Sequence, residues 1–244
     1  MNDINPNLRS SISALMKEYH TITHNIANAS TTGFKRTTSS FSNILDDKKK
    51  ASGVKEAGKE LEINKNIDFS QGSLEETSKS LDTAITGEGF FVIQTPEGSN
   101  YTRNGQFNIN QIGQLVDVEG RIVSGDAGPI VIPRNISESQ INIGSDGTIS
   151  AEGANLGKIQ LVEFGTDVAK LKPVGGNCFV APQDVMPVAA RNSHINQGYC
   201  ESSNVNTVNE TINLITVSRM YEASMNVIMK NGESTKSILN VAMG

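Results

Sequence analysis

The stretch NIANASTTGFKR, Asn25 to Arg36, predicts where the first helix of the chain ends and where the chain turns. Asn28 and Ser30 favour turns over helix interiors, and Gly33 can adopt a positive φ freely. Before this stretch, apolar residues recur at alternating intervals of four and three, the a/d spacing of a coiled coil. Asn5-Pro6 fits an N-cap followed by proline in the first helical turn. The apolar positions of this helix, its seam, are Leu8, Ile12, Leu15, Tyr19, Ile22 and Ile26.

The same spacing returns near the other end of the chain. From Glu201 the periodicity is again helical, although Gly232 and Thr235 weaken the apolar stripe. Isolated helices of this length are marginal in water, so each needs a partner that covers its apolar side. We therefore expect the two terminal helices to pair as a coiled-coil core, within one chain or between subunits. The seam of the second helix comprises Ile212, Ile215, Tyr221, Met225, Ile228 and Leu239.

The region between the helices has the pattern of an antiparallel β-domain. Short runs of alternating apolar and polar residues are separated by turn signals at Pro96-Glu97-Gly98, Asn104-Gly105, Glu119-Gly120 and Asp146-Gly147. No strand–helix–strand rhythm is present, which argues against a parallel doubly wound sheet. The expected strand runs are 89–95, 99–110, 113–123, 128–133, 141–153 and 158–164.

The predicted fold class is therefore mixed α and β. Terminal helices form an α-helical coiled-coil core, and an antiparallel all-β domain is inserted between them. The predicted organisation is an N-terminal helix and turn over 1–36, a polar linker over 37–66, the β-domain over 67–200 and the C-terminal helix over 201–244.

Composition excludes several classes of function. The formal net charge of the 244 residues is −5, so no overall basic field attracts nucleic acid or anionic lipid. No stretch approaches the roughly 18 apolar residues that a membrane-spanning helix needs. The start of the chain, MNDINPNLRSS, lacks a basic segment followed by an apolar one, which predicts no cleavable secretory signal. This favours the cytoplasm unless export follows another route.

Motifs for catalysis, cofactors and metals are weak. His20 and His24 have the i, i+4 spacing of a metal pair, but no glutamate lies between them, and two polar residues beside the seam explain them better. Cys178 and Cys200 lack CxxC spacing; we expect two small apolar residues, with a disulfide left open. The sequence therefore predicts no catalytic residue, no cofactor, no metal ligand and no enzyme activity.

The opening stretch resembles the N-terminal signature of the bacterial flagellar axial proteins, the subunits of rod and hook. Residues 70–94, 101–123 and 197–228 resemble further blocks of that family, in the same order along the chain. These blocks cover well over half of the sequence. The matching signature residues are Asn25, Ala27, Asn28, Thr31, Gly33, Phe34 and Lys35.

This resemblance implies a structural subunit of the flagellar basal-body rod, located in the periplasmic space. The family leaves the cell unfolded through the flagellar type III export apparatus, without a cleaved signal peptide. The implied partners are further copies of the chain, other rod and hook subunits and the export apparatus, with neither nucleic acid nor direct membrane insertion. The terminal helices would assemble helically, through contacts that propagate, and would transmit torque from motor to hook.

Two features point to different rod segments. Residues 125–133 and the short linker after Arg36 resemble the proximal-rod form, whereas the block from Gln197 leans towards the distal-rod form. The sequence favours the proximal rod, with the distal rod as the alternative. A coiled-coil adaptor outside the flagellum, forming a discrete dimer in solution, is the competing class.

Overall fold

The computed structural model describes residues 6–43 and 61–243, and the chain divides into two compact units. The helical unit contains residues 6–27, 37–43, 61–67 and 206–243. The β-unit contains residues 28–36 and 68–205. Each unit is therefore assembled from segments that lie far apart in the sequence.

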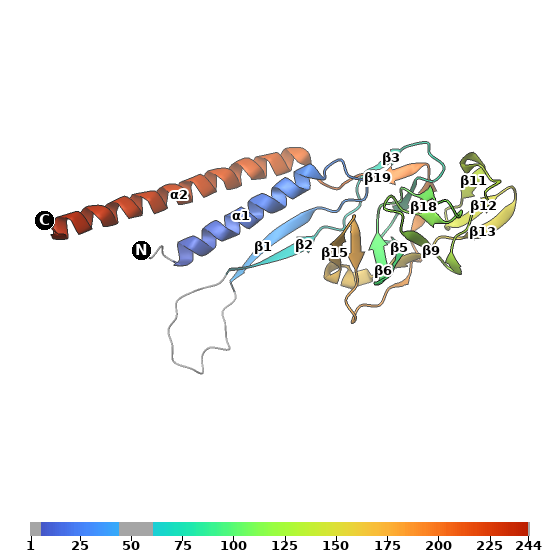
Figure 1. The fold of residues 1–244 in the computed structure, drawn as a ribbon, viewed down its shortest axis with the longest axis horizontal. Coiled ribbons are helices and arrows are strands. Elements are labelled where there is room, and N and C mark those ends of the chain that lie inside the picture. The colour runs from blue at the N-terminus through green and yellow to red at the C-terminus, as the bar shows by residue number, and fades with distance from the viewer. Residues whose placement is uncertain (1–5, 44–60, 244) are drawn as a thin grey trace. The chain divides into compact units, whose positions relative to one another are not determined.

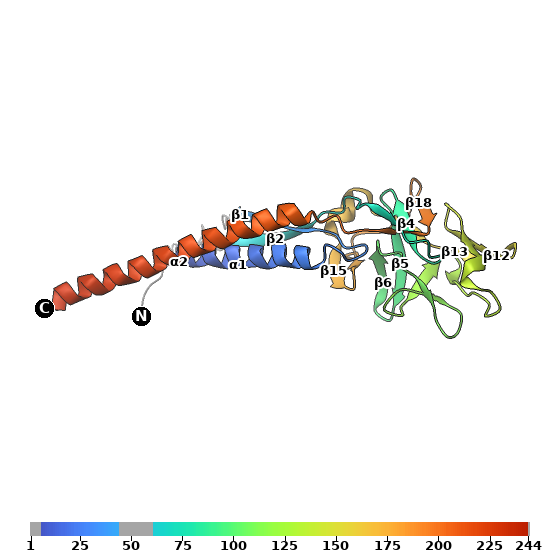
Figure 2. The same cartoon turned by 90° about the horizontal axis from the view of Figure 1, so that it is seen from above.

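Two helices and a β-hairpin build the helical unit. Helix α1 (Pro6–Ala27) contacts helix α2 (Thr207–Met243), and the two run antiparallel and side by side (Figures 1 and 2). Strands β1 (Thr37–Asn43) and β2 (Leu61–Ile67) form an antiparallel pair that contacts α1. With 37 residues against 22, α2 continues well past the first turn of α1 (Figure 1). The last part of α2 is therefore not covered by α1.

The structure places a hairpin in the region expected to be a polar linker, 37–66. Its two ends are paired strands whose register runs from Thr37 opposite Ile67 to Asn43 opposite Leu61. The sequences TTSSFSN and LEINKNI are mostly polar, and only the second has apolar residues at alternating positions, namely Leu61, Ile63 and Ile67. Backbone pairing joins these strands along their whole length. The middle of the expected linker, 44–60, lies outside the described residues.

Antiparallel strands make up the β-unit, as the sequence predicts. Within the described residues, the largest sheet has ten strands, with the order β15-β16-β6-β5-β9-β8-β7 along its main path. Strand β10 adds to β9, and β14 joins β5 to β17. Smaller sheets pair β11-β12-β13, β18-β4 and β19-β3. The elements are β3 (Leu74–Glu76), β4 (Thr83–Thr86), β5 (Phe90–Thr95), β6 (Gly98–Thr102), β7 (Asn108–Ile109), β8 (Leu115–Val116), β9 (Ile122–Gly125), β10 (Gly128–Pro129), η2 (Glu138–Gln140), β11 (Ile141–Ile143), β12 (Thr148–Ala151), β13 (Ala154–Lys158), β14 (Leu161–Glu163), η3 (Gly165–Lys170), β15 (Lys172–Gly175), β16 (Cys178–Val180), β17 (Val188–Ala189), β18 (His194–Gln197) and β19 (Tyr199–Glu201).

The six expected strand runs overlap strands of the structure. Three of the four turn signals lie between paired strands, whereas Asn104-Gly105 joins β6 to β7, which are not paired with each other. The hairpin that joins β5 to β6 ends with Thr95 opposite Gly98. The amide of Gly120 donates to Asp117, and that of Gly147 donates to Gly144, closing two further turns. The core that these strands enclose contains Leu81, Ile85, Phe91, Ile93, Phe107, Leu115, Val123, Ile130, Ile132, Ile141, Ile143, Ile149, Ile159 and Ile195.

Candidate functional site

The signature turn closes against the β-unit at Gly33. Its φ is +69°, and its amide donates a 2.7 Å hydrogen bond to the backbone oxygen of Glu201. A Cβ at this position would lie 2.5 Å from the amide nitrogen of Asn104. Both the backbone angle and the lack of space require glycine here.

The neighbouring Lys35 forms a fully buried ion pair. Its Nζ lies 2.5 Å from Oε1 of Glu201, and neither side chain is exposed (0%). The ammonium also donates to the backbone oxygen of Ser70 at 2.7 Å, while Glu201 Oε1 accepts from the amide of Gly72 at 2.9 Å. These bonds join the signature turn to two other segments of the chain.

A second buried cation stands beside this pair. Nη1 of Arg103 lies 3.5 Å from Oε2 of Glu201, and its guanidinium carbon lies 4.9 Å from the ring centre of Phe90. Burial lowers the pKa of Lys35, against the opposing effect of the Glu201 carboxylate. Burial lowers the pKa of Arg103 in the same way, again opposed by Glu201. Two cations thus share one buried carboxylate.

Asn204 is hydrogen-bonded to two other segments of the chain, at Arg36 and at Asp68. Its Oδ1 accepts from the amide of Arg36 at 2.7 Å, and its Nδ2 donates to the backbone oxygen of Asp68 at 2.8 Å. The amide of Asp68 donates in turn to the backbone oxygen of Arg36 at 2.8 Å. We call the residues Gly33, Lys35, Arg36, Asp68, Arg103, Glu201 and Asn204 the junction.

Asn25, the first signature residue, acts in the helical unit. Its Nδ2 donates to the backbone oxygen of Thr37 at 2.8 Å, and its Oδ1 accepts from the amide of Thr37 at 3.0 Å. The side-chain amide thereby pairs with β1 as a neighbouring strand would. The same Nδ2 lies 3.4 Å from Oε2 of Glu210, and both side chains are buried. Asn25 therefore holds the start of β1 and the start of α2 against α1.

The other signature residues shape the turn itself. The hydroxyl of Thr31 donates to the side-chain oxygen of Asn28 at 3.2 Å, and Phe34 is buried. Ala27 is the last residue of α1 and is exposed. The signature is thus divided: Asn25 and Ala27 belong to the helical unit, while Asn28, Thr31, Gly33, Phe34 and Lys35 belong to the β-unit.

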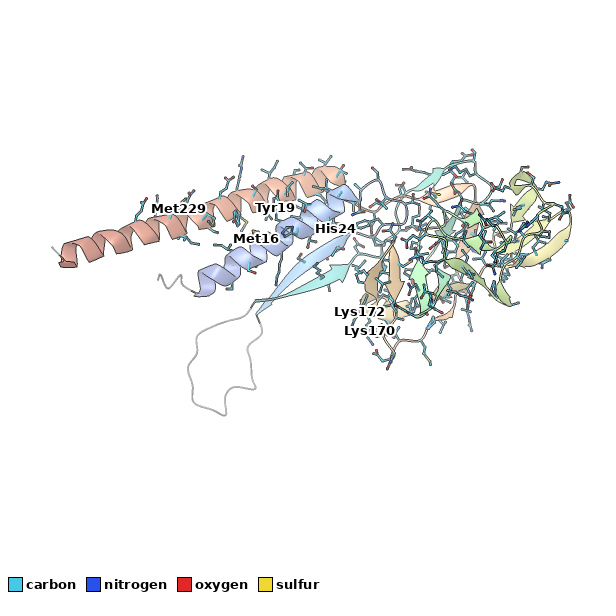
Figure 3. The ribbon with its side chains drawn as sticks, viewed as in Figure 1. Met16, Tyr19, His24, Lys170, Lys172 and Met229 are labelled. Atoms are coloured by element: carbon cyan, nitrogen blue, oxygen red, sulfur yellow. The ribbon has the colours of Figure 1, made fainter. Side chains whose placement is uncertain are left out.

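The structure covers only part of the seam of α1. Ile22 is buried, Ile12, Leu15 and Ile26 are half-buried, and Tyr19 is 41% exposed. The other buried positions of α1, namely Ala14, Thr21 and Asn25, follow a stripe rotated away from the seam. The side chain of Leu8 lies outside the described residues. Apolar surface therefore remains accessible along α1, where Figure 3 labels Met16 and Tyr19.

Helix α2 presents apolar residues on two sides. Tyr221, Met225 and Ile228 are half-buried, whereas Ile212 is 57% and Ile215 is 49% exposed. The side chain of Leu239 is not among those described. At about 100° per residue, Ile212 and Ile215 lie nearly opposite the buried side of the helix. The exposed large apolar residues of α2 are Val208, Ile212, Ile215, Met220, Val227 and Met229, the last labelled in Figure 3.

None of the residues considered for metal binding and disulfide formation belongs to the junction, although Cys200 precedes Glu201 in β19. His20 and His24 are exposed on α1, and across residues 6–43 and 61–243 no three His, Cys, Asp or Glu side chains are grouped as a metal site. Both cysteines lie in the described part of the chain, and both are buried free thiols. No described helix combines the length and apolarity needed to cross a bilayer.

Cys200 is expected to resist alkylation in the folded protein. Burial, reinforced by the Asp82 carboxylate, raises the pKa of its thiol to about 12. Because the thiolate is the reacting species, the rate at pH 8 should be lower than in the urea-unfolded chain by roughly a factor of 10³. Mass spectrometry after a pulse of iodoacetamide measures this directly. Equal labelling of Cys200 with and without urea would contradict the buried placement.

The sequence pattern does not single out five of the site residues. Asp68, Arg103, Glu201, Asn204 and Glu210 are polar residues without a local motif of their own. Glu201 and Asn204 do lie in the block from Gln197 that resembles the axial family. One signal for the pairing of Lys35 with Glu201 was available. The signature near one end of the chain includes a lysine, and the block near the other end includes a glutamate.

Comparison with known proteins identifies the relatives of this chain. A family model described as "Flagellar hook protein FlgE/F/G D1 domain" matches residues 84–151, and one described as "Flagellar basal body rod FlgEFG protein C-terminal" matches residues 196–241. The flagellar basal-body rod protein FlgF of Rhizobium meliloti is 33% identical over 93% of this chain and 91% of its own length. FlgG of Buchnera aphidicola (subspecies Schizaphis graminum) is 33% identical over 82% of this chain and 85% of its own length. FlgG of Agrobacterium fabrum is 34% identical over 85% of this chain and 87% of its own length.

Proposed function

The chain belongs to the flagellar basal-body rod protein family, and from this we propose that it is a structural subunit of the rod that assembles through its two terminal helices. The observation that carries the proposal is the exposure of apolar side chains on both helices of one chain. Ile212 and Ile215 lie on a side of α2 that nothing in the described chain covers, and Tyr19 is accessible on α1. Each such residue gains about 1.5–3 kcal/mol on full burial, so these stripes favour contact with neighbouring subunits.

Assembly would use different surfaces of the same molecule. Within a chain, the buried positions of α1 are Ala14, Thr21, Ile22 and Asn25. Of these, Thr21 accepts from Ser39 of β1, and Asn25 contacts both Thr37 of β1 and Glu210 of α2. The half-exposed seam of α1 and the outer stripe of α2 are then available for coiled-coil contacts with other copies. Because the two stripes differ, the contact is heterologous and propagates rather than closing into a dimer. Such an array transmits torque as a structural element, without enzymatic activity.

We assign the chain to the proximal rod, with the distal rod as the alternative. Support comes from residues 125–133, which resemble the proximal-rod form; the FlgF and FlgG relatives are similar to this chain to the same degree, at 33–34% identity. Export through the flagellar type III apparatus, followed by incorporation in the periplasm, completes the proposal. Other rod and hook subunits are the proposed neighbours.

Deleting the gene and imaging purified basal bodies by electron microscopy tests this function. Loss of the rod beyond the inner-membrane ring, with a tagged copy recovered in restored basal bodies, supports it. The point at which the truncated rod ends distinguishes the proximal from the distal segment. Normal rods and hooks without the gene would exclude a rod subunit.

Replacing Ile212 with aspartate is expected to abolish incorporation into basal bodies while leaving the subunit folded. The side chain is already exposed, so the free energy of unfolding should change by less than about 0.5 kcal/mol. A buried, unpaired carboxylate in the assembled array, by contrast, would cost several kcal/mol per contact. Immunoblots of purified basal bodies and thermal unfolding of the purified subunit measure the two effects.

Thr211→Asp is the matched control, because Thr211 is also exposed on α2 but lies outside the apolar stripe. It should incorporate normally. Incorporation of Ile212→Asp at the level of Thr211→Asp would show that this side of α2 does not face another subunit.

A further inference from the structure

A cavity in the β-unit lies beside the second buried cation of the junction. It has a volume of about 370 Å³ and is walled on its apolar side by Phe69, Phe90, Phe164 and Val168. Val168 belongs to η3, the short helix that ends at Lys170, labelled in Figure 3. Binding sites for small organic molecules begin near 300 Å³, so this space suits a ring-sized group.

Arg103 lines this cavity, and two of its buried nitrogen donors lack a hydrogen-bond partner in the described part of the chain. Its side chain is 3% exposed, yet among the described residues Nε and Nη1 have no hydrogen-bond partner. The closest carboxylate oxygen, Oε2 of Glu201, stays at 3.5 Å from Nη1 and has no hydrogen-bond donor itself. Buried donors without acceptors are costly, and a guanidinium offers a fork that matches a carboxylate.

Lys35 does not compete for a bound anion, because Glu201 and the Ser70 backbone oxygen already accept from its ammonium. The buried cluster of Lys35, Arg103 and Glu201 therefore carries one net positive charge. Glu88 also lines the cavity, and its carboxylate is exposed. That rim charge disfavours dianions such as phosphate more strongly than monoanions.

We propose that this cavity binds a monocarboxylate carried on an apolar or aromatic group, with the carboxylate on Arg103 and the apolar part against Phe69, Phe164 and Val168. The ligand is either a free organic acid or an acidic residue of a peptide segment that follows an aromatic one. This site is independent of the proposed role in the rod, because it lies within the β-unit and uses no residue of α1 or α2.

The test uses two probes, each with a neutral analogue. The free acid is 3-phenylpropionate, compared with 3-phenylpropanamide. The peptide is acetyl-Phe-Asp-amide, compared with acetyl-Phe-Asn-amide. Titration of the ¹⁵N-labelled full-length chain is followed by NMR at the Nε–H of Arg103 and the backbone amides of Gly87 and Gly165. We expect a saturable shift of the Arg103 Nε–H with a carboxylate probe and at least a tenfold weaker effect with its amide.

Four variants separate the site from general surface binding. Val168→Phe fills the cavity without changing any charge and should abolish the shift. Glu88→Gln removes the rim charge and should tighten binding two- to fivefold. Lys170→Gln, a change on the exposed end of η3, should have no effect. Arg103→Gln is expected to lose binding, and its folding can be checked through the amide spectrum.

The outcomes decide both the proposal and the source of the ligand. Tighter binding of 3-phenylpropionate points to a free acid, and tighter binding of acetyl-Phe-Asp-amide points to a peptide segment. Two results would overturn the proposal and leave a cavity that holds only water. One is the absence of a saturable shift with either probe at millimolar concentration and 20-fold excess over the protein. The other is equal shifts with the acid and its amide.

Discussion

Replacing Lys35 with methionine is expected to lower the free energy of unfolding by about 3 kcal/mol, which is a large part of the stability of an ordinary domain. The substitution removes the ammonium that lies 2.5 Å from Glu201 and leaves a fully buried carboxylate with one amide donor, that of Gly72. Arg103, at 3.5 Å, compensates only in part. The expected loss therefore lies at the lower end of the range for breaking a buried ion pair. Urea unfolding followed by circular dichroism gives the value.

Two further variants show whether the effect comes from burial of the charge. Lys170→Met removes an ion pair of similar length, 2.9 Å to Asp167, but both side chains are about half exposed. It should cost less than about 1 kcal/mol, as surface pairs do. The double variant Lys35→Met with Glu201→Met should recover only part of the loss, because the Glu201 charge is no longer buried unpaired but Arg103 then lacks its carboxylate partner. A single Lys35→Met variant as stable as Lys170→Met would exclude the junction as a source of stability.

Replacing Gly33 with alanine is expected to destabilise the protein by at least about 3 kcal/mol and to prevent incorporation into the rod. The left-handed backbone costs a residue with a Cβ about 1–2 kcal/mol. The remainder comes from overlap, since the Cβ would lie 2.5 Å from the amide nitrogen of Asn104 and 2.9 Å from the backbone carbon of Arg103. Backbone atoms cannot yield as a flexible side chain can, so the turn must open.

Gly120→Ala separates these two costs. Gly120 has a similar φ of +79°, but a Cβ there would meet no described atom within 4 Å. Its cost should therefore be limited to the backbone term of about 1–2 kcal/mol. Thermal and urea unfolding of both variants, measured side by side, isolate the overlap. If the two alanine variants were equally stable, the signature turn would not approach Asn104 as the structure places it.

Short sequence patterns predicted the elements whose structure depends on residues close together in the sequence. The a/d spacing around Ile12 and Ile22 predicted α1, and the Pro-Glu-Gly turn at residues 96–98 predicted the β5–β6 hairpin. Each depends on a period or a turn that a short window contains. The flagellar signature marked the turn at Gly33 for the same reason.

Pairing over long distances was not predictable in this way. Nothing near Lys35 indicates that its partner is Glu201, and nothing near Thr37 indicates that its strand pairs with 61–67. The period of α1 gives the apolar stripe but not the partner, and the buried positions include Ala14 and Thr21, which no hydrophobic pattern selects. Small and polar residues are thus buried within the chain, while the seam remains partly exposed.

The long separation of these partners has a consequence for the order of folding. Asn25 and Glu210 are 185 positions apart, and Lys35 and Glu201 are 166 positions apart. Contacts between such distant residues form slowly, because the entropy of closing the intervening loop is lost before the contact is made. An N-terminal fragment that stops short of Glu201 lacks the carboxylate that pairs with Lys35 and the backbone oxygen that accepts from the amide of Gly33, so neither unit can be completed on it. Both units therefore close only when nearly all of the chain is present.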